Sequence, residues 1–393
     1  MRPTSILVSS VALVFAGCAP TAIETTATPS AQVGPNVGAP STPADFQDAK
    51  ITEVERYRPM RVMPSCSSDS LPTHAPPSAL TEALSASQAY SDEEQGVGLI
   101  VMKDGAVIHQ SYAEGTDETT KTVSASMMKS VLALTVGIAI DRGYIGSVDD
   151  PASRYIPEWS GDERAKITIR DLLTMSSGLE PQPFGPFLLA PDANAISIAT
   201  GYAKEAGTEF RYNNGVSQVI GAIVDRQVKQ HGYAGFAEFL YQDFWCPLGG
   251  GEAFLWTDTT GMPRTYAGLH AGLDSWAKVG ELVRNGGRAN GRQIVPEAWL
   301  EEMGQPSPAN PQYGYQIWLA GGWEPMRFYA PEGGIGVPHK EPFVASDLVF
   351  FDGFGGQRVY VIPSLGLTIV RSGEVNLQFD DSVIPNLLTR ASE

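Results

Sequence analysis

The sequence predicts an α+β domain in which an antiparallel sheet, built from both chain ends, is flanked by helices and carries a mostly helical insertion. Apolar runs of strand length stand early in the chain and again near its end, with long helical patterns between them. This segregation of elements is typical of α+β proteins rather than of alternating parallel folds. The chain of 393 residues is 42% apolar and 9% aromatic, a composition ordinary for a globular core.

The first elements of this domain are a hairpin and a long helix. Residues 97–102 and 106–112 are apolar-rich runs joined by Lys-Asp-Gly, and Asp-Gly favours a tight hairpin turn. The run over 126–142 is apolar at helical spacing and meets Gly143, a residue that commonly ends helices. We therefore expect two paired strands followed by a largely buried helix.

The helical insertion is expected over roughly residues 150–290. Thr168 is placed to cap a short helix that continues to residue 175. Residues 185–199 are rich in Pro and Ala and are expected to be irregular. Further helices are predicted over 215–230, 236–244 and 274–285.

The end of the chain returns to strand patterns and closes with a helix. Alternating and aromatic-rich runs predict strands there, and the last periodic run predicts a helix. The expected strands are 313–319, 347–351, 357–362 and 367–371, and the expected helix is 381–389.

The first 17 residues are typical of an export signal. The apolar run over 6–17 is shorter than the ~20 residues that a spanning helix requires. Residues 15–18, FAGC, resemble a bacterial lipobox, so Cys18 is expected to become the lipidated first residue. A plain secretory signal cleaved nearby is the alternative. Ala19 is not the Asp that commonly retains lipoproteins in the inner membrane, which favours a periplasm-facing lipoprotein of the outer membrane.

Residues 18–49 are rich in Thr, Ala, Pro, Ser and Gly and predict a flexible tether, followed by one domain over 50–393. The formal net charge is −17, with 27 Lys and Arg against 44 Asp and Glu. Such an acidic chain is not expected to bind nucleic acid, and it is expected to reach a membrane only through the lipid anchor. Once Cys18 is lipidated, Cys66 and Cys246 remain, either as a disulfide or as two free thiols.

The candidate nucleophile is Ser126 in the Ser-x-x-Lys sequence 126–129. Residues i and i+3 share a helix face, so the Lys129 amine can reach the hydroxyl. A serine hydroxyl needs an adjacent base, and an apolar setting lowers a lysine pKa toward that task. A second match, Ser275 to Lys278, follows Asp274 at the start of a helix and is interpreted as a cap and a surface lysine.

A Tyr-x-Asn sequence, Tyr212 to Asn214, stands just before the predicted helix at Gly215. The phenol can relay a proton, and the amide can hold a substrate carbonyl or orient a lysine. A buried tyrosine and a helix-capping asparagine would be the purely structural interpretation.

In this order and context the motifs resemble the serine β-lactamase and penicillin-binding-protein hydrolase family, on its class C and esterase side. The resemblance implies a β-lactamase or D,D-peptidase-like fold. It also implies that Ser126 is the nucleophile, Lys129 its base partner and Tyr212 the second proton-transfer group, and that Asn214 contacts the substrate. The stretches that carry it are 124–151, 167–179, 209–215 and 247–249.

At the position of the family's third motif, this chain lacks the common Lys-Thr-Gly or His-Thr-Gly sequence. The corresponding stretch is 351–357, FDGFGGQ, which resembles the form in 6-aminohexanoate-oligomer hydrolases and related esterases. By that resemblance Gly353 and Phe354 lie at the substrate, and the backbone N–H groups of Ser126 and Phe354 form an oxyanion hole. A glycine-rich bend between strands is compatible with the same residues.

The loss of the motif's lysine also predicts a substrate preference. Asp352 stands in that stretch, so a substrate carboxylate is expected to be repelled there, unless Arg358 or Arg371 compensates. Neutral esters are therefore expected to react better than β-lactams.

These patterns predict a serine hydrolase that cleaves an ester, an amide or a peptide-like bond through an acyl-enzyme. It is expected to need no metal and no organic cofactor. A β-lactamase or D,D-peptidase acting on peptidoglycan-like substrates is the alternative within the family. An inactive envelope binding protein on the same fold is the alternative of another class.

Overall fold

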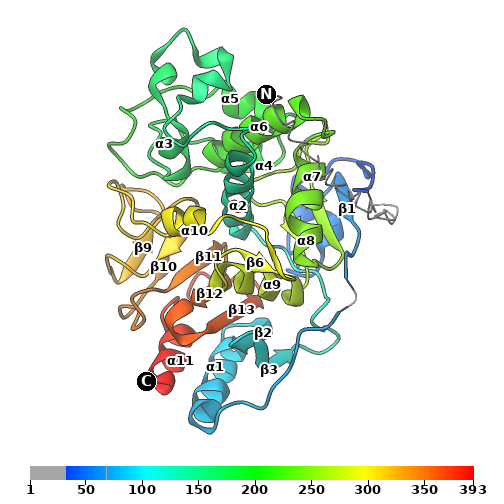
Figure 1. Cartoon of the computed structure of the whole chain (residues 1–393), viewed down its shortest axis with the longest axis vertical. Coiled ribbons are helices and arrows are strands. Elements are labelled where there is room, and N and C mark those ends of the chain that lie inside the picture. Colours follow the sequence, from blue (N-terminus) through cyan, green and yellow to red (C-terminus); the bar gives the residue numbers. More distant parts are fainter. Residues whose placement is uncertain (1–31, 68) are drawn as a thin grey trace, which may run out of the picture. The chain divides into compact units, whose positions relative to one another are not determined.

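The central layer of the domain is a six-stranded antiparallel sheet of order β3-β2-β13-β12-β11-β8. The computed structural model describes residues 32–67 and 69–393 (Figure 1). Early β2 pairs with late β13, so the sheet joins both ends of the domain, as predicted. The strands are β2 Gly96–Lys103, β3 Ala106–Tyr112, β8 Trp318–Leu319, β11 Val349–Gly353, β12 Gln357–Ile362 and β13 Leu367–Gly373.

Helices cover both faces of this sheet because successive strand residues point to opposite sides. Val359 and Val361 of β12 lie against Gly280 of α9 (Leu273–Arg284). Tyr360, between them, turns the other way and donates its hydroxyl to the Asp381 carbonyl, 3.1 Å away, just before α11 (Val383–Ser392). Helix α11 in turn packs on α1 (Thr81–Glu93).

Helix α2 (Met127–Asp141) links the sheet to the helical part of the domain (Figure 1). Every residue from Met127 to Ala139 is buried, as expected for a helix that is apolar on all sides. It contacts β11 and β12 on one side and α6 (Asn214–Gln230) on the other. The first turn of α2 therefore lies where strands and helices meet.

The helical part contains α3 to α8. Its bounds are α3 Ile169–Leu173, α4 Phe184–Leu188, α5 Ala193–Ile198, α7 Phe236–Phe239 and α8 Cys246–Leu248, with a π-helix, Leu240–Trp245, before α8. Thr168 caps α3 as predicted: its side chain accepts from the Asp171 N–H, and Asp171 accepts from the Thr168 N–H. Among the described residues no helix is both long and apolar enough to cross a membrane.

Two sequence expectations about regular structure are wrong. Residues 185–199 are not irregular, because Pro183 precedes α4 and the Asp192 side chain accepts from the Ala195 N–H to start α5. The strand expected over 313–319 is reduced to Trp318–Leu319. Gln316 has a φ of +54°, which bends the chain so that Tyr313 pairs back with Trp318.

A smaller sheet of order β1-β4-β5 holds part of the expected tether. Its strands are β1 Met60–Met63, β4 Ala253–Trp256 and β5 Leu269–His270. Gly34 N–H donates to Val62 O at 2.8 Å and Val37 N–H to Met60 O at 2.9 Å, and the Phe46 ring packs on Trp256. The tether expected over 18–49 is therefore wrong for its described part, because Gly34 and Val37 pair with β1 and Phe46 packs on Trp256.

Cys66 and Cys246 form a disulfide with their Cα atoms 5.0 Å apart, which decides between the two alternatives that the sequence left open. Cys18 and the expected signal peptide, residues 1–17, lie outside the described residues. The remaining elements are the helix α10 Glu297–Met303 and two short hairpins, β6 Arg288–Ala289 with β7 Arg292–Gln293 and β9 Met326–Phe328 with β10 Gly336–Pro338.

Candidate active site

Ser126 and Lys129 lie at the start of helix α2, one turn apart. Ser126 is the N-cap residue and is half-buried, and Lys129 Nζ lies 2.8 Å from its Oγ. Ala125, immediately before, has a φ of +45°, a left-handed conformation that is costly for a residue with a side chain. This sharp entry leaves the hydroxyl at the end of the helix rather than inside the core.

Lys129 is enclosed, with 1% of its surface exposed. Besides Ser126, its Nζ contacts Asn214 Oδ1 at 2.7 Å and the Tyr266 carbonyl at 2.9 Å. Within the described ranges no carboxylate forms an ion pair with it. Burial lowers the pKa of this amine well below its ordinary value, and the more distant Asp352 carboxylate opposes that shift.

The partners of Lys129 fix which atom its lone pair faces. A neutral amine has two N–H donors, and the carbonyl oxygens of Asn214 and Tyr266 can only accept. In the neutral form those two contacts use both donors and leave the lone pair toward the Ser126 hydroxyl, whereas the ammonium form donates to all three oxygens. The arrangement can therefore take a proton from Ser126.

Tyr212 reaches the same point from the loop before α6. Its ring centroid lies 4.7 Å from Lys129 Nζ, and its ring packs among Trp318 and Tyr329 with centroid distances of 6.0 and 5.1 Å. Burial, and after it the Asp352 charge, raise the pKa of the Tyr212 hydroxyl well above its ordinary value, while a hydrogen bond with Ser126 acts in the opposite direction. The phenol is therefore protonated at neutral pH and lies within reach of Ser126.

Asn214 is the first residue of α6, and the Asn213 side chain caps that helix by accepting from the Gly215 N–H. Sequence reasoning offered two roles for Asn214, contact with a substrate carbonyl or orientation of a lysine. Its Oδ1 orients Lys129. Its Nδ2 donates to no acceptor among the described residues, so this half of the amide is free for a ligand.

Gly353 ends β11 directly beside the segment that precedes Ser126. A Cβ at Gly353 would lie 2.4 Å from the Ser124 carbonyl oxygen, so the position must be glycine for the strand to approach this closely. Phe354 follows in the turn, with 37% of its surface exposed. Neither the Phe354 N–H nor the Ser126 N–H donates to an acceptor in the described part of the chain. Two free amide donors thus accompany the hydroxyl.

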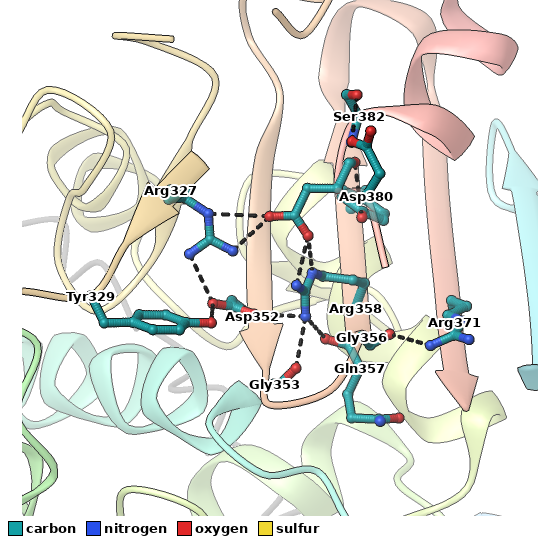
Figure 2. Close-up of polar contacts among 12 residues, drawn as sticks. Arg327, Tyr329, Asp352, Gly353, Gly356, Gln357, Arg358, Arg371, Asp380 and Ser382 are labelled. Atoms are coloured by element: carbon teal, nitrogen blue, oxygen red, sulfur yellow. Dashed lines mark hydrogen bonds and ion pairs between the residues drawn. The ribbon is translucent and has the colours of Figure 1, made fainter. Parts of the chain in front are cut away.

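Asp352 does not repel anions as the sequence suggested. Its carboxylate is buried and lies 2.9 Å from Arg327 Nη1 and 2.6 Å from Arg358 Nη1, and it also accepts from the Tyr329 hydroxyl at 2.7 Å (Figure 2). The two guanidinium groups hold the pKa of this carboxyl below its usual range despite burial. The expectation that Asp352 repels a substrate carboxylate is therefore wrong, because Arg327 and Arg358 neutralise the Asp352 charge in the folded domain.

Arg358 and Arg371 are also unable to pair with a substrate carboxylate. Both are buried: Arg358 joins Asp352 and Asp381, and Arg371 donates to the Gly356 and Glu94 carbonyls. Neither guanidinium is therefore available to replace the lysine of the family's third motif.

The second Ser-x-x-Lys sequence has a structural role, but Ser275 is not the cap that the sequence predicted, because α9 begins at Leu273 with Gly272 as its N-cap residue. Ser275 is buried near the start of α9; its Oγ accepts from the Gly251 N–H and lies 3.2 Å from Asp274 Oδ1. Lys278 donates to the Gly249 carbonyl at 2.8 Å and makes no contact with Ser275. The pair lacks the Ser–Lys hydrogen bond that Ser126 and Lys129 have.

A cavity of about 750 Å³ elsewhere in the domain contains none of these residues. Its Arg226 pairs with Glu158 at 2.7 Å, and its Lys229 pairs with Asp225 at 2.7 Å. The described residues contain no group of three or more His, Cys, Asp or Glu side chains placed to hold a metal ion. The Ser126 group therefore remains the candidate site.

Sequence reasoning missed two contributors to this group. Tyr266 acts through its backbone carbonyl, which carries no sequence signal. Tyr329 holds the Tyr212 backbone through a 2.9 Å hydrogen bond and reaches Asp352 with its hydroxyl, and it lies far from every motif in the sequence. Only the fold brings these residues together.

The sequence of this chain is similar to those of known hydrolases. Residues 81–373 match the protein-family model described as Beta-lactamase. A 6-aminohexanoate-dimer hydrolase from Paenarthrobacter ureafaciens is 23% identical over 226 residues, an alignment that covers 52% of this chain and 56% of that protein. The match thus spans little more than half of that curated relative.

Solved structures share the fold. A Bacillus anthracis protein provisionally titled a 6-aminohexanoate-dimer hydrolase superposes with a TM-score of 0.68 at 19% identity, over 87% of this chain and 92% of that one. A family VIII carboxylesterase superposes with a TM-score of 0.62 at 14% identity, over 81% and 99%. The predicted fold class is confirmed.

Proposed function

The chain belongs to the beta-lactamase family, and from this premise we propose that it is a serine hydrolase that cleaves an ester or amide bond through an acyl-enzyme on Ser126. The observation that carries the proposal is the orientation of Lys129. Its Nζ lies 2.8 Å from Ser126 Oγ, and in the neutral amine the Asn214 and Tyr266 oxygens use both N–H donors, which leaves the lone pair for the Ser126 proton. A buried amine with a low pKa is suited to act as a general base.

The chemistry follows from these positions. Lys129 accepts the Ser126 proton as Oγ attacks the substrate carbonyl carbon, and the carbonyl oxygen becomes an oxyanion. The free N–H groups of Ser126 and Phe354 are placed to stabilise that charge. Tyr212 gives its proton to the departing alcohol or amine as the bond breaks, and it is reprotonated by the proton that Lys129 took from Ser126. Water then attacks the acyl ester and gives one proton to Lys129. Lys129 returns that proton to Ser126 Oγ as the ester bond breaks and the carboxylic acid leaves.

The proposed substrates are neutral esters or linear amides. The relatives include a 6-aminohexanoate-dimer hydrolase and a carboxylesterase. Penicillins and cephalosporins carry a carboxylate beside the reactive carbonyl, and here neither Arg358 nor Arg371 is free to pair with it. The preference therefore follows from the engagement of Arg358 and Arg371 inside the domain rather than from repulsion by Asp352.

The test compares wild type with two alanine variants. Ser126→Ala should lower hydrolysis of p-nitrophenyl butyrate by at least ~10³-fold and abolish labelling by an acyl-reactive phosphonate. Ser275→Ala, at the other Ser-x-x-Lys sequence, is the matched control and should keep both. An active Ser126→Ala variant would contradict the proposal, and a wild type that is neither labelled nor active would favour a binding protein.

The substrate class is tested with the same enzyme preparation. The kcat/KM for p-nitrophenyl butyrate should exceed that for nitrocefin by ~10-fold or more, which corresponds to about 1.4 kcal/mol of transition-state stabilisation. Efficient nitrocefin turnover with negligible esterase activity would instead favour a β-lactamase.

A further inference from the structure

Two buried guanidinium groups donate hydrogen bonds to the turn that contains Phe354. Arg358 Nη1 donates to the Gly353 carbonyl at 2.7 Å and to the Gln357 carbonyl at 2.8 Å, and Arg371 Nη1 donates to the Gly356 carbonyl at 2.9 Å (Figure 2). Both arginine side chains are almost completely buried. Three of the carbonyls in the segment 353–357 are thus fixed by cations inside the domain.

Arg358 is itself held in one orientation by a closed set of charges. It contacts Asp352 and Asp381, each at 2.6 Å, and Arg327 contacts the same two carboxylates at 2.9 and 2.6 Å. We call these four residues the charge quartet. Two positive and two negative groups cancel, which is what allows them to remain buried, since an unpaired buried charge is very costly. The position of the Arg358 guanidinium is therefore tightly constrained.

The peptide plane transmits this constraint to the candidate site. In a trans peptide, the C=O of one residue and the N–H of the next point in opposite directions. The Gly353 carbonyl faces Arg358, so the Phe354 N–H must face away from the charge quartet. On that side it meets no acceptor from the described residues, and the backbone of Ser124 lies next to Gly353.

We propose that Arg358, assisted by Arg371, is a positioning residue that preorganises the Phe354 N–H as an oxyanion donor. This inference rests on the proposed acyl-enzyme function and deepens it, because it gives the buried charges beneath β11 a role in the reaction. A rotated 353–354 peptide would turn its carbonyl toward the oxyanion and replace attraction by repulsion. Arg358 excludes that rotation by holding the carbonyl.

Two conservative variants separate positioning from a general contribution to stability. Arg358→Lys keeps the charge but cannot bridge two carboxylates and two carbonyls with one ammonium group. Arg327→Lys disturbs the same quartet, yet Arg327 contacts no carbonyl of segment 353–357 among its hydrogen bonds and ion pairs. Arg327→Lys therefore tests the charge quartet without removing a hydrogen bond to the turn. Circular dichroism and thermal unfolding establish that each variant is folded before activity is compared.

The expected result is a selective loss of transition-state stabilisation. Removing one oxyanion donor costs about 10²–10³-fold in kcat, so a misaligned donor in Arg358→Lys should lower kcat by about 10- to 100-fold. KM should change by less than about 3-fold, since ground-state binding does not use the oxyanion donors. Arg327→Lys leaves the hydrogen bonds from Arg358 to the Gly353 and Gln357 carbonyls in place, so the loosened charge quartet should lower kcat by no more than about 3-fold.

A boronic acid that forms a tetrahedral adduct with Ser126 gives the second measurement. Its Ki should rise in Arg358→Lys by about the same factor as kcat falls, because the adduct mimics the transition state. Equal losses in Arg358→Lys and Arg327→Lys, or wild-type kcat and Ki in folded Arg358→Lys, would overturn the inference.

Two further outcomes keep the inference and the proposed function distinguishable. Should Arg358→Lys fail to fold, Arg371→Lys is measured instead, with an expected loss of about 3- to 10-fold in kcat and in boronate affinity; a folded Arg371→Lys variant with neither loss would overturn the inference. Activity retained by Ser126→Ala would overturn the acyl-enzyme function itself. An inactive Ser126→Ala variant beside a fully active Arg358→Lys variant would overturn the positioning role alone.

Discussion

Replacing Asn214 by aspartate should keep Lys129 protonated at neutral pH, so that it no longer acts as a base. Asn214 Oδ1 lies 2.7 Å from Lys129 Nζ, and Asn214→Asp changes little but the charge at that point. As the first residue of α6, the new carboxylate would also face the positive end of the helix dipole, so the fold should not be weakened at this position. The change adds a charge beside Lys129 and removes the Nδ2 donor, and only the added charge should shift the pH profile.

The magnitude follows from the distance. Two unit charges 2.7 Å apart attract by about 6 kcal/mol at an effective dielectric constant of 20. Burying the new carboxylate costs part of this energy, and we take roughly half as a net stabilisation of the ammonium form. About 3 kcal/mol lowers the ratio of neutral to protonated Lys129 by about 100-fold, and the activity at neutral pH should fall by up to that factor.

The assay is the pH dependence of kcat/KM for p-nitrophenyl butyrate. In wild type, the low pKa of Lys129 places the rise in activity well below the ordinary range of a lysine. In Asn214→Asp that rise should move to higher pH, with activity partly restored in alkaline buffer. Asn214→Ala removes the acceptor without adding charge and should lose activity with little movement of the profile. A wild-type profile in Asn214→Asp would refute the assignment of Lys129 as the base.

Three other predictions concern the body of the protein and its location. Burial lowers the pKa of His270 from 6.5 to about 3, so this neutral imidazole supports folding above pH 6.5, and its contribution is lost as the pH falls toward 3. At pH 5 this loss is about 2 kcal/mol of unfolding free energy, and denaturant titrations at pH 7 and pH 5 should show a smaller difference in His270→Leu than in wild type. Replacing Cys66 and Cys246 by alanine should lower the free energy of unfolding by about 2–4 kcal/mol, and an unchanged denaturation midpoint would contradict a stabilising disulfide. Cys18→Ser should move the protein from the membrane fraction to the soluble fraction, and unchanged membrane association would remove the proposed lipid anchor.

Local patterns were enough to predict much of the fold and the central pair of the candidate site. The apolar runs predicted β2, β3, β12 and β13, and helical periodicity predicted α2 and α6 to within a residue or two. The i, i+3 spacing allows Lys129 to reach Ser126, but Ser275 and Lys278 have the same spacing without that hydrogen bond. The Tyr-x-Asn sequence and the family resemblance were needed to choose between the two pairs. Elements whose conformation depends on local residues were therefore predictable from the sequence.

Contacts between distant elements decided the rest. The sequence placed Asp352 as a free charge beside the substrate, yet Arg327 and Arg358 neutralise it inside the domain. It left two roles open for Asn214, and the position of α6 against α2 turned its Oδ1 to Lys129. Charge and hydrogen-bonding state depend on which groups meet after folding. The sequence by itself therefore determined which chemical groups this protein has and how each local segment is built, and only the tertiary structure decided which of those groups face one another and with what charge.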